Sequence, residues 1–282
     1  MQIATTENTI YTSPDASKIF CYTPSIIVTP TGRLIVSFDL GGEGVKSIEG
    51  HKSSRAGGSR FGQGKIFISD DNGQKWTFVQ NFPFWHARLF TIGNSIYLIG
   101  HAGDICIMKS EDNGESWSDT YFLTHGEKWH SSACNVLFSN GNVYLAMEQR
   151  CRLNEVTGWD VAGLSPTLFR ACVEDNLCLA SSWSRSEKFI YKEVFDGAKL
   201  DFFGIPFYDC ETNKPKEIAT GINNAPLGWL EANVVKFVDK DHIWHTDLKE
   251  VFHLFLRAHT GGVNYAHLFK IEIQDDQSMI PS

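Results

Sequence analysis

An eight-residue motif occurs twice in the sequence, and it constrains the fold more than any other feature. It reads S-x-D-x-G-x-x-W at 69–76 and at 110–117, and its two aspartates are 41 residues apart. Asp accepts backbone N–H bonds in a turn, and Gly takes the positive φ that a tight turn needs. The residues with a structural role are Ser69, Asp71, Gly73, Trp76, Ser110, Asp112, Gly114 and Trp117. A period of this length, with an alternating apolar run before each turn, indicates repeated small antiparallel sheets.

The rest of the chain can be divided on the same template, because hairpin signals such as Gly93-Asn94 lie between its apolar runs. The predicted strands are 25–29, 33–38, 64–69 and 76–80; 87–92, 95–100, 104–109 and 117–123; 132–138, 143–148 and 166–173, with a degraded motif at 174–176 before Trp183; and 232–238, 250–256 and 264–273. We therefore predict an all-β fold, a β-propeller of four-stranded antiparallel blades. Four blades are recognisable, as part of a five- or six-bladed ring.

Several segments stand apart from this template. Residues 184–228 are predicted to be an insertion between blades of a single domain, 1–282. The fourth blade has no outer strand of its own, and residues 8–13 are a candidate to supply it. A further turn is expected to begin at 274–278, close to the end of the sequence. This predicts either an unusual ring closure or a C-terminally truncated propeller.

Composition excludes several other classes of protein. Gly (24), Phe (20), Trp (8) and Tyr (8) are abundant, as is typical of β structure. The net charge of −8, without a block of Lys or Arg, disfavours nucleic acid and anionic membranes as partners. No apolar run reaches the roughly 18 residues of a membrane span. Residues 1–20 lack the features of a signal peptide.

The repeated motif resembles the Asp box, or BNR repeat, of the sialidase superfamily. The resemblance implies that each box is the turn between the third and fourth strands of a blade, on the face opposite the active site. It also implies a glycosidase that is secreted or periplasmic, although localisation stays open. Segments 228–231 and 256–259 look like those of uncharacterised sialidase-like proteins. Segment 21–26 matches the family at Pro24, but the arginine that the family places before this proline is absent.

If the boxes lie on one face of a propeller, the other face carries the starts of the inner strands and the ends of the second strands. Acids and bases gather at these positions, and glycoside hydrolysis needs two carboxyl groups. Burial beside a Trp would raise the pKa of a carboxyl and suit it to the acid role. The catalytic candidates are Glu231, Glu148, Asp39 and His130. The alternative for each carboxylate is a salt bridge, for example between Glu148 and Arg150.

Aromatic and basic residues at the same positions are candidates for binding substrate. They are Trp85, His86, Arg88, His101, Trp129, Arg150, Trp229, Arg257, His259 and Tyr265. The tryptophans either pack between blades or form platforms for a sugar ring. The arginines suit a carboxylate on an acidic sugar, and loop 41–64 is a candidate flap. The histidines have no HxH or HExxH spacing, so we predict neither a metal nor a cofactor.

Three functions are compatible with these residues. The first is a sialidase-like glycoside hydrolase that cleaves a terminal sugar from an oligosaccharide or polysaccharide, with two of the three carboxylates as acid and base. The second is a polysaccharide lyase with a His or Tyr base and an Arg on the uronate carboxylate. The third is a non-catalytic propeller that binds carbohydrate or protein. The sequence leaves the sugar, the linkage and the stereochemical course open.

Overall fold

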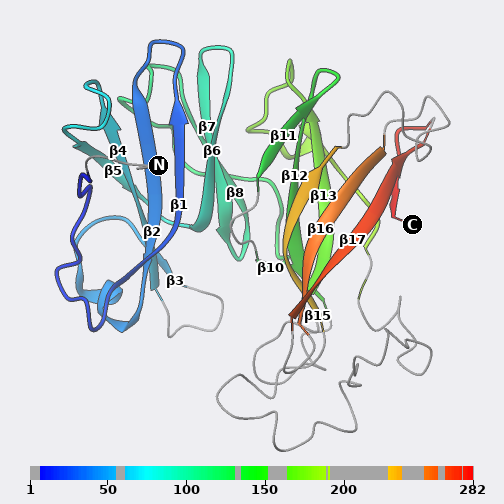
Figure 1. Cartoon of the computed structure of the whole chain (residues 1–282), viewed down its shortest axis with the longest axis horizontal. Coiled ribbons are helices and arrows are strands. Elements are labelled where there is room, and N and C mark those ends of the chain that lie inside the picture. Colours follow the sequence, from blue (N-terminus) through cyan, green and yellow to red (C-terminus); the bar gives the residue numbers. More distant parts are fainter. Residues whose placement is uncertain are drawn as a thin grey trace, which may run out of the picture. The chain divides into compact units, whose positions relative to one another are not determined.

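The computed structural model describes residues 7–54, 61–130, 135–151, 164–188, 190, 228–236, 251–259, 264–274 and 276–281. Its regular structure consists of antiparallel β-sheets and short 3-10 turns (Figure 1). The chain groups into two compact units, one of residues 1–126 with 178–180, the other of 127–177 with 181–282. No helix among the described residues is long and apolar enough to cross a membrane.

The first unit contains two sheets. One orders β1 (Phe20–Val28), β2 (Leu34–Gly41) and β4 (Phe61–Ser69), with β3 (Ser53–Ser54) and β5 (Thr77–Phe82) both paired to β4. The other orders β6 (Trp85–Ile92), β7 (Ser95–Ala102), β8 (Asp104–Ser110) and β9 (Tyr121–Phe122). The 3-10 turn η1 (Glu43–Ser47) follows β2. The second strands β2 and β7 are buried along almost their whole length, since neighbours cover both of their faces.

The second unit also contains two sheets. One orders β10 (Trp129–His130), β12 (Asn142–Arg150), β13 (Leu164–Cys172) and β14 (Trp183–Arg185), with β11 (Val136–Ser139) also paired to β12. The other orders β15 (Gly228–Val235), β16 (Val251–His259), β17 (Asn264–Ile273) and β18 (Met279–Pro281). The 3-10 turn η3 (Ala180–Ser182) precedes β14.

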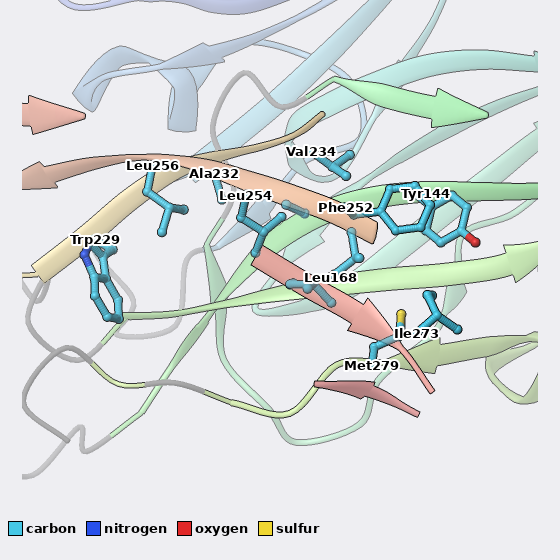
Figure 2. Close-up of a cluster of buried hydrophobic side chains, with 12 residues drawn as sticks. Tyr144, Leu168, Trp229, Ala232, Val234, Phe252, Leu254, Leu256, Ile273 and Met279 are labelled. Carbon is cyan, nitrogen blue, oxygen red and sulfur yellow. The ribbon is translucent and has the colours of Figure 1, made fainter. Parts of the chain in front are cut away.

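Aromatic and aliphatic side chains between successive sheets form the cores. In the second unit, Tyr144, Trp229 and Phe252 are fully buried in one cluster, to which β12, β13 and β15 to β18 contribute side chains (Figure 2). In the first unit, Phe82 and Phe84 lie in a cluster between the sheet of β1 and the sheet of β6. A cluster around Phe38 covers the other face of the β1 sheet. Within each unit, the two sheets therefore pack against each other through apolar side chains.

The two repeated motifs form the same turn. Ser69 Oγ donates to Asp71 Oδ1 (2.9 Å) and accepts the Gly73 N–H (2.9 Å), while Asp71 Oδ1 accepts the Lys75 N–H (2.8 Å). The second turn repeats these contacts at 2.8, 2.9 and 2.9 Å, among Ser110, Asp112, Gly114 and Ser116. The two glycines have φ of 81° and 86°. Each turn joins the third strand of its sheet to the fourth, and its Ser and Asp are engaged with the backbone.

Two predictions about the chain ends are wrong. Residues 8–13 form no strand; instead Ile10 and Tyr11 pack on the Phe38 cluster, and Asn8 donates to the Gly73 carbonyl (2.8 Å). The apolar side chains of Ile10 and Tyr11 therefore cover the β1 sheet, and the segment adds no strand to a sheet. The fourth sheet has its own outer strand, because β18 pairs with β17 after a turn at 274–278. Residues 184 and 185 belong to β14, and 191–227 lie outside the described residues.

Candidate active site

The candidate site rests on a backbone feature that three inner strands share. Strands β1, β6 and β15 each lose register with their second strand over two residues. Within each bulge a residue other than glycine takes the left-handed conformation. These residues are Thr23 (φ 50°), His86 (φ 53°) and Glu231 (φ 60°). Such backbone costs on the order of 1 kcal/mol or more and persists only where the surroundings hold it. Two of the three residues are sequence-predicted site residues.

In the second unit, Glu148 holds this feature in place. Its side chain is 1% exposed, and its Oε1 accepts the N–H of Ala232, the residue after Glu231, at 2.7 Å. Its Oε2 lies 2.9 Å from His130 Nδ1. One buried carboxyl group therefore connects the imidazole of His130 to the backbone that carries Glu231. Of the Glu148 and Glu231 side chains, only Glu231 reaches solvent, at 40% exposure.

Glu231 is in turn paired with a residue of its own sheet. Its Oε2 lies 3.2 Å from Arg257 Nε, and the Arg257 side chain is 37% exposed. Arg257 lies on the second strand β16, opposite Leu230. The ion pair places a guanidinium beside the Glu231 carboxylate, which remains accessible to solvent. At this exposure the pair contributes little to stability, on the order of 1 kcal/mol or less.

The environments of the two glutamates differ. Burial raises the pKa of Glu148 to about 8, against the opposing hydrogen bond from the Ala232 N–H and the charge of Arg150. Burial also raises the pKa of Glu231, but the Arg257 guanidinium opposes this rise and the Glu148 carboxylate adds to it. Glu148 therefore keeps a proton at neutral pH, whereas Glu231 has a cation beside it. Two carboxyl groups with separated tasks are what acid and base catalysis requires.

The first unit contains a related arrangement around Asp39. This residue on β2 is 1% exposed, and its Oδ1 accepts the N–H of His86, the left-handed residue of β6, at 3.2 Å. No hydrogen-bond partner for Oδ2 exists among the described residues. Burial raises the pKa of Asp39 to about 8, with the His86 N–H and the Arg88 charge acting in the opposite direction. Asp39 thus holds the bulge of β6 as Glu148 holds that of β15.

Histidines take the place of the Glu231–Arg257 pair in the first unit. His86 Nδ1 lies 3.1 Å from His101 Nε2, and their ring centroids are 5.2 Å apart. His101 is buried, whereas the His86 side chain is half-buried. Arg88 is buried, donates to the Ala87 carbonyl (2.8 Å) and acts on Asp39 through its charge. The structure thus brings four of the predicted residues together in this unit: Asp39, His86, Arg88 and His101.

The three predicted tryptophans are buried. Trp85, Trp129 and Trp229 are 8%, 1% and 0% exposed. Trp229 packs edge-on against Phe269 (4.7 Å between centroids), and Trp129 packs edge-on against Phe169 (5.2 Å). This burial favours packing, the first of the two interpretations that the sequence left open.

The remaining predicted residues lie at the edges of the site. Arg150 is half-buried at the end of β12 and acts on Glu148 through its charge. His259 and Tyr265 lie on β16 and β17, but their side chains lie outside what the structure describes. In segment 41–64, the 3-10 turn η1 buries Val45, and residues 55–60 are not described. Over the described residues, no cluster of three or more His, Cys, Asp or Glu side chains could hold a metal.

The comparisons with known proteins concern the fold. No family model matches the sequence, and no curated protein matches it. The structure is similar to that of an α-L-arabinofuranosidase from Lactobacillus brevis, with a TM-score of 0.53 and 13% identity over 96% of this chain and 80% of that one. It is also similar to a protein of unknown function from Dyadobacter fermentans, with a TM-score of 0.51 and 14% identity over 94% and 68% of the two chains.

The fold class is that of a β-propeller. The predicted all-β class and the predicted four-stranded antiparallel blades are confirmed. At this identity the likeness carries the fold and not the residues of the site. The number of blades in the ring and the assignment to the sialidase superfamily stay predictions.

Sequence reasoning missed the backbone groups of the site. The N–H groups of His86 and Ala232 are the partners of the two buried carboxylates. No glycine marks the left-handed positions, so residue type gave no signal for them. The residues at these positions, Trp85-His86 and Trp229-Leu230-Glu231 at the starts of β6 and β15, differ from each other and share no motif that marks a bulge.

Proposed function

We propose that this protein is a glycoside hydrolase, with His130 and Glu148 as its proton donor and Glu231 as its carboxylate base or nucleophile. The observation that carries the proposal is the position of Glu148, whose two oxygens contact His130 and the Ala232 N–H next to Glu231. A change in the charge of Glu148 therefore acts on both partners. All three side chains belong to the second unit.

The proton transfer follows from these contacts. Glu148, protonated at neutral pH, donates its hydrogen bond to His130 Nδ1, so the imidazole carries its own proton on Nε2. Nε2–H protonates the leaving glycosidic oxygen as the bond to the anomeric carbon breaks. His130 Nδ1 then takes the Glu148 proton, which leaves an ionised Glu148. His130 is 14% exposed and can face the substrate, whereas Glu148 cannot.

Glu231 completes the reaction at the anomeric carbon. It either attacks this carbon directly or accepts a proton from the water that attacks it; the separation of the reacting groups decides which. Arg257 lies beside the carboxylate, and its charge opposes the rise that burial causes in the pKa of Glu231. The substrate class is a terminal sugar on an oligosaccharide or polysaccharide. The repeated box motif supports a sialidase-like enzyme, and the likeness to an arabinofuranosidase adds pentofuranosides to the substrates worth assaying.

The test is a screen of aryl glycosides and oligosaccharides, including α-L-arabinofuranosides and sialosides, with wild type and three variants. We expect Glu231→Gln to lose activity on every substrate. Glu148→Gln keeps the hydrogen bond to His130 but has no proton to give, so it should lose most activity on poor leaving groups and least on activated aryl groups. Glu174→Gln, an exposed glutamate of the same unit, serves as the control. Full activity of Glu231→Gln would overturn the proposal.

A polysaccharide lyase is the second candidate, and the contact between His130 and Glu148 favours it. If Glu148 instead accepts the Nδ1 proton, Nε2 is a base that can remove a proton from the carbon next to a uronate carboxylate. Elimination would then give an unsaturated uronide with ultraviolet absorbance. A lyase would lose its activity in His130→Gln and keep it in Glu231→Gln. Adding His130→Gln to the panel therefore separates the two reactions.

A further inference from the structure

The two units carry the same arrangement of three residues at matching positions. The first is a buried carboxylate on a second strand, Asp39 or Glu148. The next is a left-handed residue in the bulge of the following inner strand, His86 or Glu231. The carboxylate accepts a backbone N–H of this bulge, from His86 itself in the first unit and from Ala232, the residue after Glu231, in the second. The last is a second-strand residue paired with the bulge residue, His101 or Arg257.

The strand register supports this equivalence independently of the contacts. His101 lies opposite Trp85, the last residue that pairs before the bulge of β6. Arg257 lies opposite Leu230, the last residue that pairs before the bulge of β15. His86 and Glu231 each follow directly. The backbone therefore presents His86 in the first unit in the way that it presents Glu231 in the second.

The chemistry presented in the first unit differs in charge. The second unit offers a carboxylate beside a guanidinium, whereas the first offers two imidazoles with Arg88 buried nearby. One imidazole nitrogen of the pair must donate to the other across 3.1 Å. When the pair takes up one further proton it carries a positive charge, which attracts an anion.

We propose that His86, supported by His101 and Arg88, binds the carboxylate of an acidic sugar. The ligand class, a sugar, rests on the proposed function; the anionic group rests on the charges of this unit. His86 supplies the exposed part of the site because its side chain is half-buried while those of His101 and Arg88 are buried. Asp39 acts as a positioning residue, since it holds the His86 backbone from behind.

The other charged groups around this pair are compatible with an anion. Asp39, the acidic group that contacts the His86 backbone, is held neutral by burial up to a pKa of about 8. Burial, and next the charge of Asp39, raise the pKa of the Cys21 thiol, so this group adds no negative charge at neutral pH. Lys65 adds a cation near Cys21. Below about pH 8 the site thus carries the charge of Arg88 and of any proton on the histidine pair.

The experiment compares D-galacturonate with D-galactose, which share a ring and differ in the carboxylate. Binding to the full chain is followed at pH 6 by calorimetry and by the imidazole nitrogen signals in NMR spectra. We expect wild type to bind galacturonate about tenfold more tightly than galactose. His86→Asn should abolish this preference, because Asn favours the left-handed conformation and keeps the bulge but cannot be protonated.

Two further variants complete the design. His125→Asn, an exposed histidine of the same unit, should keep the preference. Glu231→Gln should keep it too while losing hydrolysis, so failure of the proposed function and failure of this site are distinguishable. Equal binding of the two sugars by wild type overturns the inference. An unchanged preference in His86→Asn also overturns it, provided that the unfolding midpoint and the NMR spectrum show this variant to be folded.

Discussion

The two units of the molecule use one backbone device to present different chemistry. In both, a buried carboxylate accepts an N–H from a left-handed bulge, at 3.2 Å for Asp39 and at 2.7 Å for Glu148. In the first unit the bulge residue is a histidine paired with a histidine; in the second it is a glutamate paired with an arginine. The carboxylates behind the bulges vary little in burial, and both have a pKa of about 8.

This difference separates what belongs to the fold from what belongs to the reaction. Asp39 and Glu148 satisfy backbone groups that any such bulge leaves unpaired, so their burial does not by itself indicate catalysis. His86 and Glu231 are half-buried, and their identity is not required by the backbone. Function is therefore to be sought first at the bulge residues and next at the one side chain that a buried carboxylate also contacts, His130.

The largest expected effect separates the two bulge residues in turnover. Glu231→Gln should lower kcat by about 10²- to 10⁴-fold, because it removes the carboxylate at the anomeric carbon. His86→Asn should raise KM and change kcat by less than about threefold, because binding of a remote group affects ground state and transition state alike. Steady-state kinetics on the best substrate of the screen measure both. A loss of kcat in His86→Asn as large as that in Glu231→Gln would mean that the units do not differ in role.

The next effect tests the raised pKa that Asp39 and Glu148 have in common. Their folded-state pKa of about 8 lies above the unfolded values near 4, so the unfolded chain releases these protons first as pH rises. Stability from each group is fully present below pH 4 and is lost as pH rises to about 8. The slope amounts to roughly 1 kcal/mol per pH unit for each group.

Glu148→Gln and Asp39→Asn keep the hydrogen bond from the bulge and remove the ionisation. Each should therefore make the pH dependence of stability shallower by about one proton between pH 5 and pH 8. Urea unfolding of both variants over this range, beside wild type, gives the slopes. If only one variant makes the dependence of unfolding free energy on pH shallower, the two carboxylates have different ionisation states in the folded protein. Asp39 and Glu148 would then not be equivalent in the two units.

The sequence predicted the regular part of this structure from residue types with one mechanical role. The Ser, Asp, Gly and Trp of the two boxes located β4, β5, β8 and β9, because each of these residue types suits a turn or the strand after it. The Asn-Gly turn at 140–141 located β11 and β12 in the same way. These signals are local, and local signals survive without knowledge of the tertiary structure.

The parts that escaped prediction depend on contacts distant in sequence. Residues 8–13 were a candidate outer strand, but the ring of Tyr11 packs against Phe38 and Phe67, which are distant in sequence. The bulges of β6 and β15 carry His86 and Glu231 at a positive φ that is uncommon for residues other than glycine, and Asp39 and Glu148 hold these bulges from another strand. The three carboxylates could be singled out from the sequence, but not which of them faces solvent.

A third effect concerns how the two carboxylates are accommodated. Asp39 lies opposite Gly64 on β4, whereas Glu148 lies opposite Pro166 on β13. A Cβ at residue 64 would meet the ring of the fully buried Phe82 at 1.9 Å. Gly64→Ala should therefore destabilise the protein by about 1–3 kcal/mol, whereas Gly41→Ala, whose Cβ meets the exposed Tyr22 ring at 2.8 Å, should cost less than about 0.5 kcal/mol. Equal unfolding midpoints for the two variants would show that Phe82 can move, and that the glycine opposite Asp39 is not a requirement of this unit.

The smallest effect concerns the turns on which the repeat was recognised. Ser69 and Ser110 are buried, and each accepts the N–H of a turn glycine at 2.9 Å. The same strand position in the second unit is Cys172, at the end of β13. Ser69→Ala and Ser110→Ala leave a buried N–H without its acceptor and should each cost about 1 kcal/mol, whereas Cys172→Ala should cost less than about 0.5 kcal/mol. Urea midpoints at a single pH resolve this difference. If Cys172→Ala costs as much stability as the serine variants, the degraded turn before Trp183 depends on the residue at this strand position as the intact turns do. The changed motif at 174–176 would then not have removed this dependence.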